Sequence, residues 1–440
     1  MRDPAPDHVL GRLSRQAGWL LGANILVLGV AFVQGVLLAR NLGPAAFGSL
    51  ALMLALTDLI QQLLSSRVWE TATTFVTRYR ANGDTRAAAA VLKICLSVDL
   101  IAATASTLLL LASAEFLARW FIKDPGAVGA LRACAVMPIL LVPIATGRSM
   151  LRMADRYRWL SSELLAESLV RLIAVWIVLA LVGTELGPVV TAYLIAAGVG
   201  SVAMVWLMTR AWRELGLGDW RDSPLSAVPQ PRQVLRFMLY SNLSGTFRLL
   251  SAKADLLMLG WFVQPAAVGV YRLARSLADP LVALSDPVYQ ATYPELARLI
   301  HKGATADARR LTDSIRRRAW LVIVPACMLV TLLAGWVIPL VFGTAYTSAV
   351  PLVQLLVWQL VWIPYLWVPG LLLSMGKAGV VASLTGVDAV IYVAMLLVLV
   401  PTMGVTGAAL ATVLRFVIWA VAAAELGRRA NHELVTVMPA

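Results

Sequence analysis

The stretch WLLGANILVLGVAFVQGVLLARNLGPAAFG, residues 19–48, contains the two features that predict the fold. Its first part, Trp19–Ala39, is almost wholly apolar and long enough to cross the hydrocarbon core of a bilayer, which takes about 20 residues. This run is too long for a signal-peptide core, lacks a small-residue cleavage site and is followed by further apolar runs. Its second part, PAAFG at 44–48, has a counterpart later in the chain. We therefore predict a polytopic membrane protein with an internal repeat.

The composition supports the same class. The chain has 440 residues, of which 60% are hydrophobic and 14% are charged, and its mean hydropathy is +0.79. These values lie far outside those of soluble domains. Window hydropathy predicts an all-α integral membrane protein with twelve transmembrane helices. The spans lie near 18–38, 45–66, 88–111, 127–147, 160–182, 188–208, 233–263, 267–290, 319–342, 349–375, 379–400 and 404–424.

Lysine and arginine are distributed unequally between the two sets of loops. The loops and tails on one side carry 25 of them, whereas the opposite loops carry only Arg40, Arg119 and Lys123. Because positive residues stay in cytoplasmic loops, we expect both termini to be cytoplasmic in a multi-pass protein of the bacterial cytoplasmic membrane. This asymmetry accounts for most of the net charge of +13, so no nucleic-acid partner is expected.

The second half of the chain repeats features of the first. PAAFG at 44–48, with Asp58 ten residues after its glycine, returns as PAAVG at 265–269, with Asp279 ten residues after its glycine. A second echo pairs the prolines of the fourth and tenth spans, Pro138 and Pro143 with Pro364 and Pro369. We predict two pseudo-symmetric six-helix lobes around a central cavity, residues 1–208 and 233–440, joined by a cytoplasmic interfacial linker, residues 209–232.

Charged residues interrupt the seventh and eighth spans. A charge at mid-bilayer costs about 3 kcal/mol on insertion scales, so such residues normally face a partner or water. Arg272, Arg275 and Asp279 share one face of the eighth span because they lie three and then four residues apart. The seventh span adds Arg248, Lys253 and Asp255 at a similar depth, with Arg248 about 22 Å from the cytoplasmic end of its helix.

Two arrangements of these charges remain open. In one, Asp255 forms a salt bridge with Arg272 or Arg275 and joins the two spans. In the other, four bases face one acid at their depth, and the excess base binds a diphosphate, whose oxygens guanidinium groups match in bidentate fashion. Arg248, Lys253, Arg272 and Arg275 are then the substrate-binding candidates. Asp58, Asp255 and Asp279 are candidate coupling or cavity acids, although Asp58 can also simply bond a neighbouring helix.

Other polar residues within the spans suggest structural roles. Glu163, Glu167 and Arg171 follow one another at intervals of four, a favourable intrahelical spacing. Asp388 and Arg415 are single charges whose partners the sequence does not identify. The three cysteines and three histidines have no ligand spacing, so no metal site is predicted.

Several segments resemble the oligosaccharide-lipid flippases of polysaccharide biosynthesis, in the superfamily that also contains the multidrug and toxin extrusion proteins and the lipid II flippases. They are the outer loop ARNLGPAAFG at 39–48, the proline-rich fourth and tenth spans, and GVTGAAL at 404–410 opening the last span. The resemblance implies a flippase that moves a polyprenyl-diphosphate-linked oligosaccharide, such as an O-antigen, lipopolysaccharide or exopolysaccharide precursor, from the inner to the outer leaflet by alternating access. Glycosyltransferases and a polysaccharide polymerase are its expected partners.

Two other functions are weighed against this one. An ion-coupled multidrug or cation exporter of the same superfamily would need acids and aromatic rings along its cavity. A membrane enzyme acting on the same lipid would need a substantial outer loop or an acidic metal-binding loop, and the sequence has neither. We therefore expect no enzyme activity, no catalytic residues and no cofactor, and the chain has no nucleotide-binding glycine-rich loop.

Overall fold

The structure is a computed structural model that describes residues 6–65, 68–219, 222–283, 305–365 and 378–437, with isolated positions between them. Every regular element within these ranges is helical. The chain forms two compact units: unit 1 comprises Met1–Leu42 and Ser49–Leu250, and unit 2 comprises Gly43–Gly48 and Ser251–Ala440. The lobe limits at residues 208 and 233 remain a prediction.

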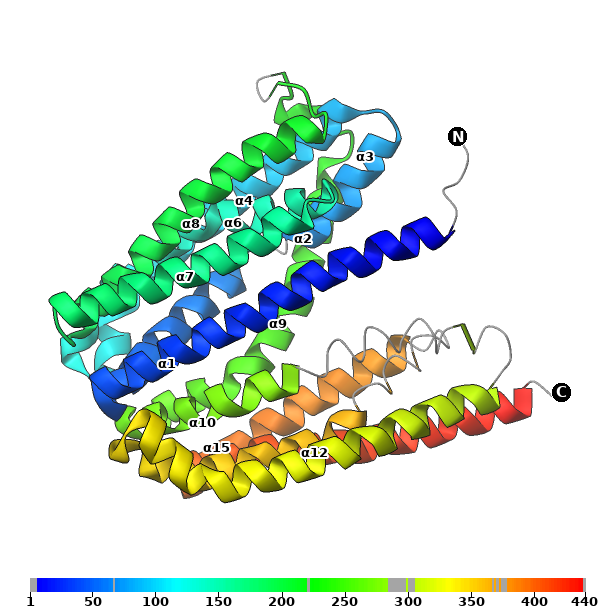
Figure 1. Cartoon of the computed structure of the whole chain (residues 1–440). Coiled ribbons are helices and arrows are strands. Elements are labelled where there is room, and N and C mark those ends of the chain that lie inside the picture. The colour runs from blue at the N-terminus through cyan, green and yellow to red at the C-terminus, as the bar shows by residue number, and fades with distance from the viewer. Residues whose placement is uncertain are drawn as a thin grey trace. The chain divides into compact units, whose positions relative to one another are not determined.

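The elements follow one another along the chain as coloured in Figure 1. Unit 1 contains α1 (Pro6–Leu64) apart from residues 43–48, α2 (Val68–Thr71), η1 (Ala72–Val76), α3 (Thr77–Ala81), α4 (Thr85–Phe116), η2 (Leu117–Ile122), η3 (Pro125–Ala127), α5 (Val128–Cys134), α6 (Met137–Met153), α7 (Tyr157–Leu181), α8 (Leu186–Glu214), η4 (Leu225–Ala227) and the first part of α9 (Pro231–Phe262). Unit 2 contains the rest of α9, α10 (Pro265–Ala283), α12 (Thr305–Phe342), η5 (Thr344–Ala349), α13 (Val350–Leu356), η6 (Val357–Tyr365) and α15 (Ala378–Val437).

The two longest helices are each interrupted by a glycine. Gly43 in α1 has φ 70° and ψ 172°, and Gly404 in α15 has φ 57° and ψ −131°. Side chains with a Cβ rarely adopt these backbone angles, so glycine permits the chain to leave one helix and start the next. Gly43 lies between the first and second predicted spans, and Gly404 is the first residue of the predicted twelfth span.

Eight helical segments in the described part of the chain are long and apolar enough to cross a membrane. Two of these segments, Gly18–Leu64 and Gly379–Arg428, contain the glycine interruptions. The predicted seventh and eighth spans correspond to α9 and α10, which do not qualify because of their charged and polar residues. The all-helical, multi-pass architecture is thus confirmed, whereas the number of twelve spans remains a prediction.

The repeated pentapeptides pack against each other within unit 2. A Cβ on Gly48 would lie under 3.0 Å from the backbone of Pro265 and Gly269, and a Cβ on Gly269 would meet the backbone of Pro44 in the same way. Real Cβ atoms do not approach this closely. Glycine is therefore required at the fifth position of both pentapeptides by a reciprocal helix contact.

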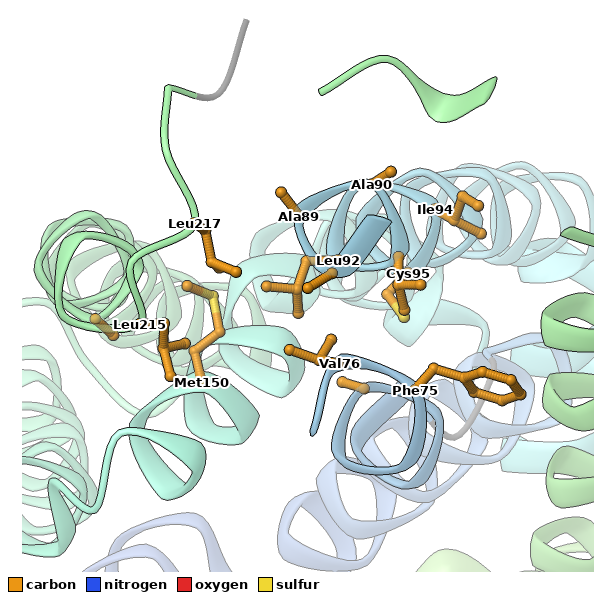
Figure 2. Packing of buried hydrophobic residues seen from close by; sticks show 14 of the residues in the cluster. Phe75, Val76, Ala89, Ala90, Leu92, Ile94, Cys95, Met150, Leu215 and Leu217 are labelled. Atoms are coloured by element: carbon orange, nitrogen blue, oxygen red, sulfur yellow. The ribbon is translucent and has the colours of Figure 1, made fainter. Parts of the chain in front are cut away.

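A hydrophobic core cluster of unit 1 is formed by residues of η1, α4, α6 and α8 and of the segment after α8, with single residues from other helices. Figure 2 shows Phe75 and Val76 facing Leu92 and Cys95, with Leu215 and Leu217 beside Met150. Leu215, Leu217 and Val228 belong to the predicted interfacial linker, yet each is at most 3% exposed. Lys93 of α4 also donates a hydrogen bond to the Ser223 carbonyl. The linker is thus packed onto unit 1 through these side chains.

Candidate functional site

The charged face of α10 begins with a tyrosine. Tyr271, Arg275 and Asp279 follow one another at intervals of four residues, which places them on one side of the helix. The Nε of Arg275 donates to Oδ2 of Asp279 at 3.0 Å. Arg272 directly follows Tyr271 in the chain and is exposed. It lies close enough to Asp279 to interact with it electrostatically. The predicted stripe is therefore present on α10.

Asp255 of α9 is the buried acid of the cluster, with 3% of the residue exposed. Its Oδ2 accepts a hydrogen bond from the Tyr271 hydroxyl at 2.6 Å and lies 3.1 Å from Nη1 of Arg275. Its Oδ1 accepts from the backbone nitrogen of Leu256 at 2.8 Å. Three donors thus surround one carboxylate, as a charge held away from water requires.

Hydroxyl groups extend this cluster onto the second half of α15. Oγ1 of Thr412 donates to the carbonyl of Ala408 at 2.9 Å and lies 3.1 Å from the Tyr392 hydroxyl. Because a hydroxyl has a single proton, Thr412 accepts from Tyr392. The Tyr271 hydroxyl lies 3.4 Å from the same oxygen. Asp255, Tyr271, Thr412 and Tyr392 therefore form one buried group of polar side chains, in which Tyr271 donates to Asp255 and Tyr392 donates to Thr412.

A second ion pair adjoins this polar chain. Arg415 donates to Asp388 through Nε at 2.9 Å and through Nη2 at 2.6 Å, both to Oδ2. The guanidinium carbon of Arg415 lies 4.6 Å from the centre of the Tyr392 ring, at cation–π distance. The two intramembrane charges that the sequence left without partners are thus partners of each other.

The structure brings some of the predicted site residues together and not others. Arg275, Asp255 and Asp279 form one cluster in unit 2, which we call the α10 cluster, with Arg272 at its edge. Lys253, two residues before Asp255 on α9, is partly buried and has contacts of its own. The side chain of Arg248 lies outside the described residues. Asp58 belongs to unit 1 and interacts there with Cys134.

This geometry changes the charge count that the sequence suggested. The salt bridge between Asp255 and Arg275 is present, as in the first of the two open arrangements. Asp279 is a second acid that contacts the same arginine, so Arg275 is not a surplus cation. The cluster therefore contains two acids where the sequence suggested one, and Arg272 is exposed at its edge.

Unit 1 contains its own buried charge network, which we call the α7 network. Arg148 of α6 donates to both carboxylate oxygens of Glu163, at 3.0 and 3.1 Å, and to Oε2 of Glu167 at 2.7 Å. Arg171 lies 3.6 Å from Glu167 and donates to Oε1 of Gln34 on α1 at 3.2 Å. Gln34 in turn donates to the Tyr193 hydroxyl at 2.7 Å. Two arginines balance two glutamates.

Several members of these networks were not found from the sequence. The sequence predicts an end of the fourth span near residue 147, which leaves Arg148 in the following loop, whereas α6 continues to Met153 and directs Arg148 at Glu163. Tyr271 and Tyr392 appear in the sequence as ordinary apolar filler. The intervals of four in Tyr271–Arg275–Asp279 were a usable signal for the tyrosine, but nothing local indicates Gln34 or Tyr193.

Comparison with known proteins identifies a family and a curated relative of this chain. The family described as "Polysaccharide biosynthesis protein" matches residues 13–300. A relative from Haloferax volcanii, the "Probable low-salt glycan biosynthesis flippase Agl15", is 20% identical over 232 residues, which cover 51% of this chain and 49% of that protein. The match thus spans about half the length of that curated relative.

Solved transporter structures share the fold. An inward-facing multidrug resistance MATE family transporter of the MOP superfamily has a TM-score of 0.79 with 16% identity, covering 94% of this chain and 96% of that one. The lipid II flippase MurJ in an inward closed conformation has a TM-score of 0.72 with 10% identity, covering 95% and 89%. These proteins are transporters and flippases rather than enzymes, in agreement with the expectation for this chain. The chain, whose match extends over well over half of its length, belongs to the polysaccharide biosynthesis protein family and has the fold of the MOP superfamily transporters.

Proposed function

We propose that this protein is a flippase that moves polyprenyl-diphosphate-linked oligosaccharide from the inner to the outer leaflet by alternating access. Membership of the polysaccharide biosynthesis family and the flippase activity named for two similar proteins support the substrate class. Glycosyltransferases would supply such a substrate and a polymerase would consume it.

The observation that carries the proposal is the exposed Arg272 beside the α10 cluster. Arg275 is held by Asp255 and Asp279 and is only 18% exposed, so its guanidinium is largely committed. Arg272 is exposed on a helix that is otherwise largely apolar. A cation in this setting favours a phosphorylated headgroup, with Lys253 and Arg248 as the other candidate contacts. Asp279, which is 41% exposed, can release Arg275 to the substrate.

The competing exporter function receives less support from the same geometry. A cation exporter needs carboxylates that are available to its cargo, but Asp255 is bonded to Arg275, and Glu163 and Glu167 are bonded to Arg148. The acids of both networks are thus already neutralised by arginine. We therefore place lipid-linked oligosaccharide before organic cations as the transported substrate.

Flipping in proteoliposomes tests the proposal. The purified chain is reconstituted with a fluorescent polyprenyl-diphosphate oligosaccharide, and the initial flipping rate is measured from the accessibility of the fluorophore to an impermeant quencher. We expect Arg272→Gln to lower the rate about ten-fold or more, the equivalent of one charge-assisted hydrogen bond of about 1.5–3 kcal/mol. Arg272→Lys should retain part of the rate because it keeps the charge and loses the bidentate geometry.

The matched control is Arg119→Gln. Arg119 lies on η2, is 60% exposed at its side chain and pairs with Glu115 at the end of the preceding helix α4, away from the α10 cluster in the chain. Its replacement should leave flipping unchanged. Wild-type flipping by Arg272→Gln would reject the role of this arginine. Transport of a cationic dye under a proton gradient, without any lipid flipping by the wild-type chain, would favour the exporter.

A further inference from the structure

A groove lies on unit 1 between α7 and α8, separate from the α10 cluster. Its volume is about 320 Å³, at the lower end of the range for ligand sites of about 300–1,000 Å³. Small and aliphatic residues line most of the groove, including Ala166, Val170, Gly200 and Ala203. At Gly200 a Cβ would come within 3.5 Å of the Glu167 side chain, so the absent side chain leaves the groove open there.

One end of the groove is aromatic and basic. Trp159 opens α7 and Trp206 lies near the end of α8, and both line the groove together with Arg210. The guanidinium carbon of Arg210 lies 3.8 Å from the centre of the Trp206 ring and 5.9 Å from that of Trp159. Tryptophan and arginine together are typical of the interface between the hydrocarbon core and the headgroups. The distribution of positive residues predicts that this end is cytoplasmic.

The surface around the groove is apolar and uncovered within unit 1. Ile173, Ile195 and Val202 are each more than half exposed. On a membrane-spanning helix, exposed apolar side chains of this kind are suited to contact with acyl chains. A ligand of the groove therefore needs an apolar part that lies along the groove and a polar part that contacts Arg210.

The charged residues of the groove favour an anionic polar group in its ligand. The two acids in the floor, Glu163 and Glu167, are bonded to Arg148, and Glu167 also lies near Arg171. Among the described residues, no carboxylate pairs with Arg210, whose contacts are the two tryptophan rings. Three arginines thus face two glutamates, which leaves one positive charge at the mouth of the groove. The Trp206 face that an organic cation would need is already covered by Arg210.

We propose that this groove binds an anionic glycerophospholipid of the inner leaflet, with its phosphate at Arg210 between the two tryptophans and an acyl chain along α7 and α8. Arginine supplies the paired donors that phosphate oxygens accept, and the inner leaflet carries anionic lipid. The site is distinct from the substrate cluster in unit 2, and the inference does not depend on the proposed function.

Lipid binding to the purified full chain in detergent tests the proposal. Native mass spectrometry is used to titrate phosphatidylglycerol and phosphatidylethanolamine with the same acyl chains. We expect phosphatidylglycerol to bind about five-fold more tightly, which corresponds to about 1 kcal/mol for one basic residue. Arg210→Gln should remove this preference. Arg213→Gln, three residues along the same helix end, is the matched control because Arg213 is exposed and lies outside the groove.

A second variant tests the apolar part. Ala203→Leu fills the middle of the groove at an exposed position of α8, so it should lower the binding of both lipids without unfolding the chain. Equal affinity for the two headgroups in the wild-type chain would overturn the proposal, as would an unchanged preference in Arg210→Gln. Undiminished binding by Ala203→Leu would place the lipid elsewhere and overturn the assignment of the groove.

Discussion

The α7 network of unit 1 and the α10 cluster of unit 2 differ in how their arginines are paired with carboxylates. In unit 1, Arg148 comes from one helix to two glutamates on the next, and the chain of contacts ends in the neutral side chains of Gln34 and Tyr193. In unit 2, one arginine is held between two aspartates, and a second arginine, Arg272, remains exposed at the edge. Within the α7 network both arginines are bonded to glutamate, whereas the α10 cluster has an exposed arginine at its edge.

This difference is the basis for assigning the proposed substrate contact to the α10 cluster and a structural role to the α7 network. A balanced network whose members are bonded to one another holds helices together and leaves little charge for a ligand. A cluster in which the acids fix one arginine and leave another exposed presents a cation at a defined place. The proposed substrate site therefore belongs to the α10 cluster, and the α7 network itself is assigned no ligand.

The largest expected effect comes from removing the buried acid of unit 2. Asp255→Asn leaves Arg275 with the more exposed Asp279 alone, and breaking a buried ion pair costs about 3–5 kcal/mol. The three cysteines are buried and unpaired, so their reaction with a maleimide dye on heating reports unfolding. A chain that keeps only Cys327 reports on unit 2, and one that keeps only Cys95 reports on unit 1. We expect Cys327 to react at a markedly lower temperature in Asp255→Asn.

The double variant Asp255→Asn with Arg275→Gln serves as the control for that experiment. Removing the arginine as well removes the uncompensated charge, so part of the lost stability should return. If the single variant unfolds at the wild-type temperature, or if the double variant is no better than the single one, the ion pair does not hold unit 2 together.

A smaller loss is expected from the corresponding change in unit 1. Glu163→Gln removes one of the two carboxylates that Arg148 binds, but Arg148 keeps Glu167. Losing hydrogen bonds between charged groups costs about 1.5–3 kcal/mol. Cys95 should therefore react earlier on heating, by less than Cys327 does in Asp255→Asn. A larger shift in Glu163→Gln than in Asp255→Asn would reverse the comparison between the networks.

The repeated glycines test the one place where the two sequence halves play equal parts. Gly48→Ala and Gly269→Ala each put a methyl group against the backbone of the opposite pentapeptide, and such overpacking costs about 1–3 kcal/mol. Both should lower the unfolding temperature by a similar amount. Gly35→Ala, at a helical position with nothing within 4 Å of the added Cβ, is the control and should be neutral or stabilising. Tolerance of alanine at only one of the two positions would show that the contact is not reciprocal.

The smallest effect is expected at the exposed pair of Arg119 and Glu115. Their side chains are 60% and 55% exposed, and an exposed pair four residues apart on a helix contributes about 0.3–0.5 kcal/mol. Arg119→Gln should leave both thiol unfolding curves within error of the wild type. A clear shift would mean that exposure does not predict how much a charged residue contributes to stability in this protein, and it would weaken the interpretation of Arg272 as a cation available to substrate.

The sequence predicted those parts of the candidate site that depend on spacing along one helix. Arg275 and Asp279 pair because side chains four residues apart are neighbours on a helix, and Glu167 and Arg171 do so more loosely, at 3.6 Å. It missed Arg148 because the end of a span cannot be located to one turn from hydropathy. Thr412 and Tyr392 were missed because hydroxyl groups in an apolar run have no local pattern that reveals their partners.

The amino-acid sequence alone was enough to predict an all-helical membrane protein with an internal repeat, since the length of apolar runs, the distribution of lysine and arginine, and the repeated motifs are properties of the chain alone. Only the tertiary structure decided which intramembrane charges neutralise one another. Asp388 meets Arg415 across 27 residues, and Asp255 meets Thr412 through Tyr271 across far more. The physical reason is that a buried charge must find its partner wherever packing puts one, and packing is set by all the helices together.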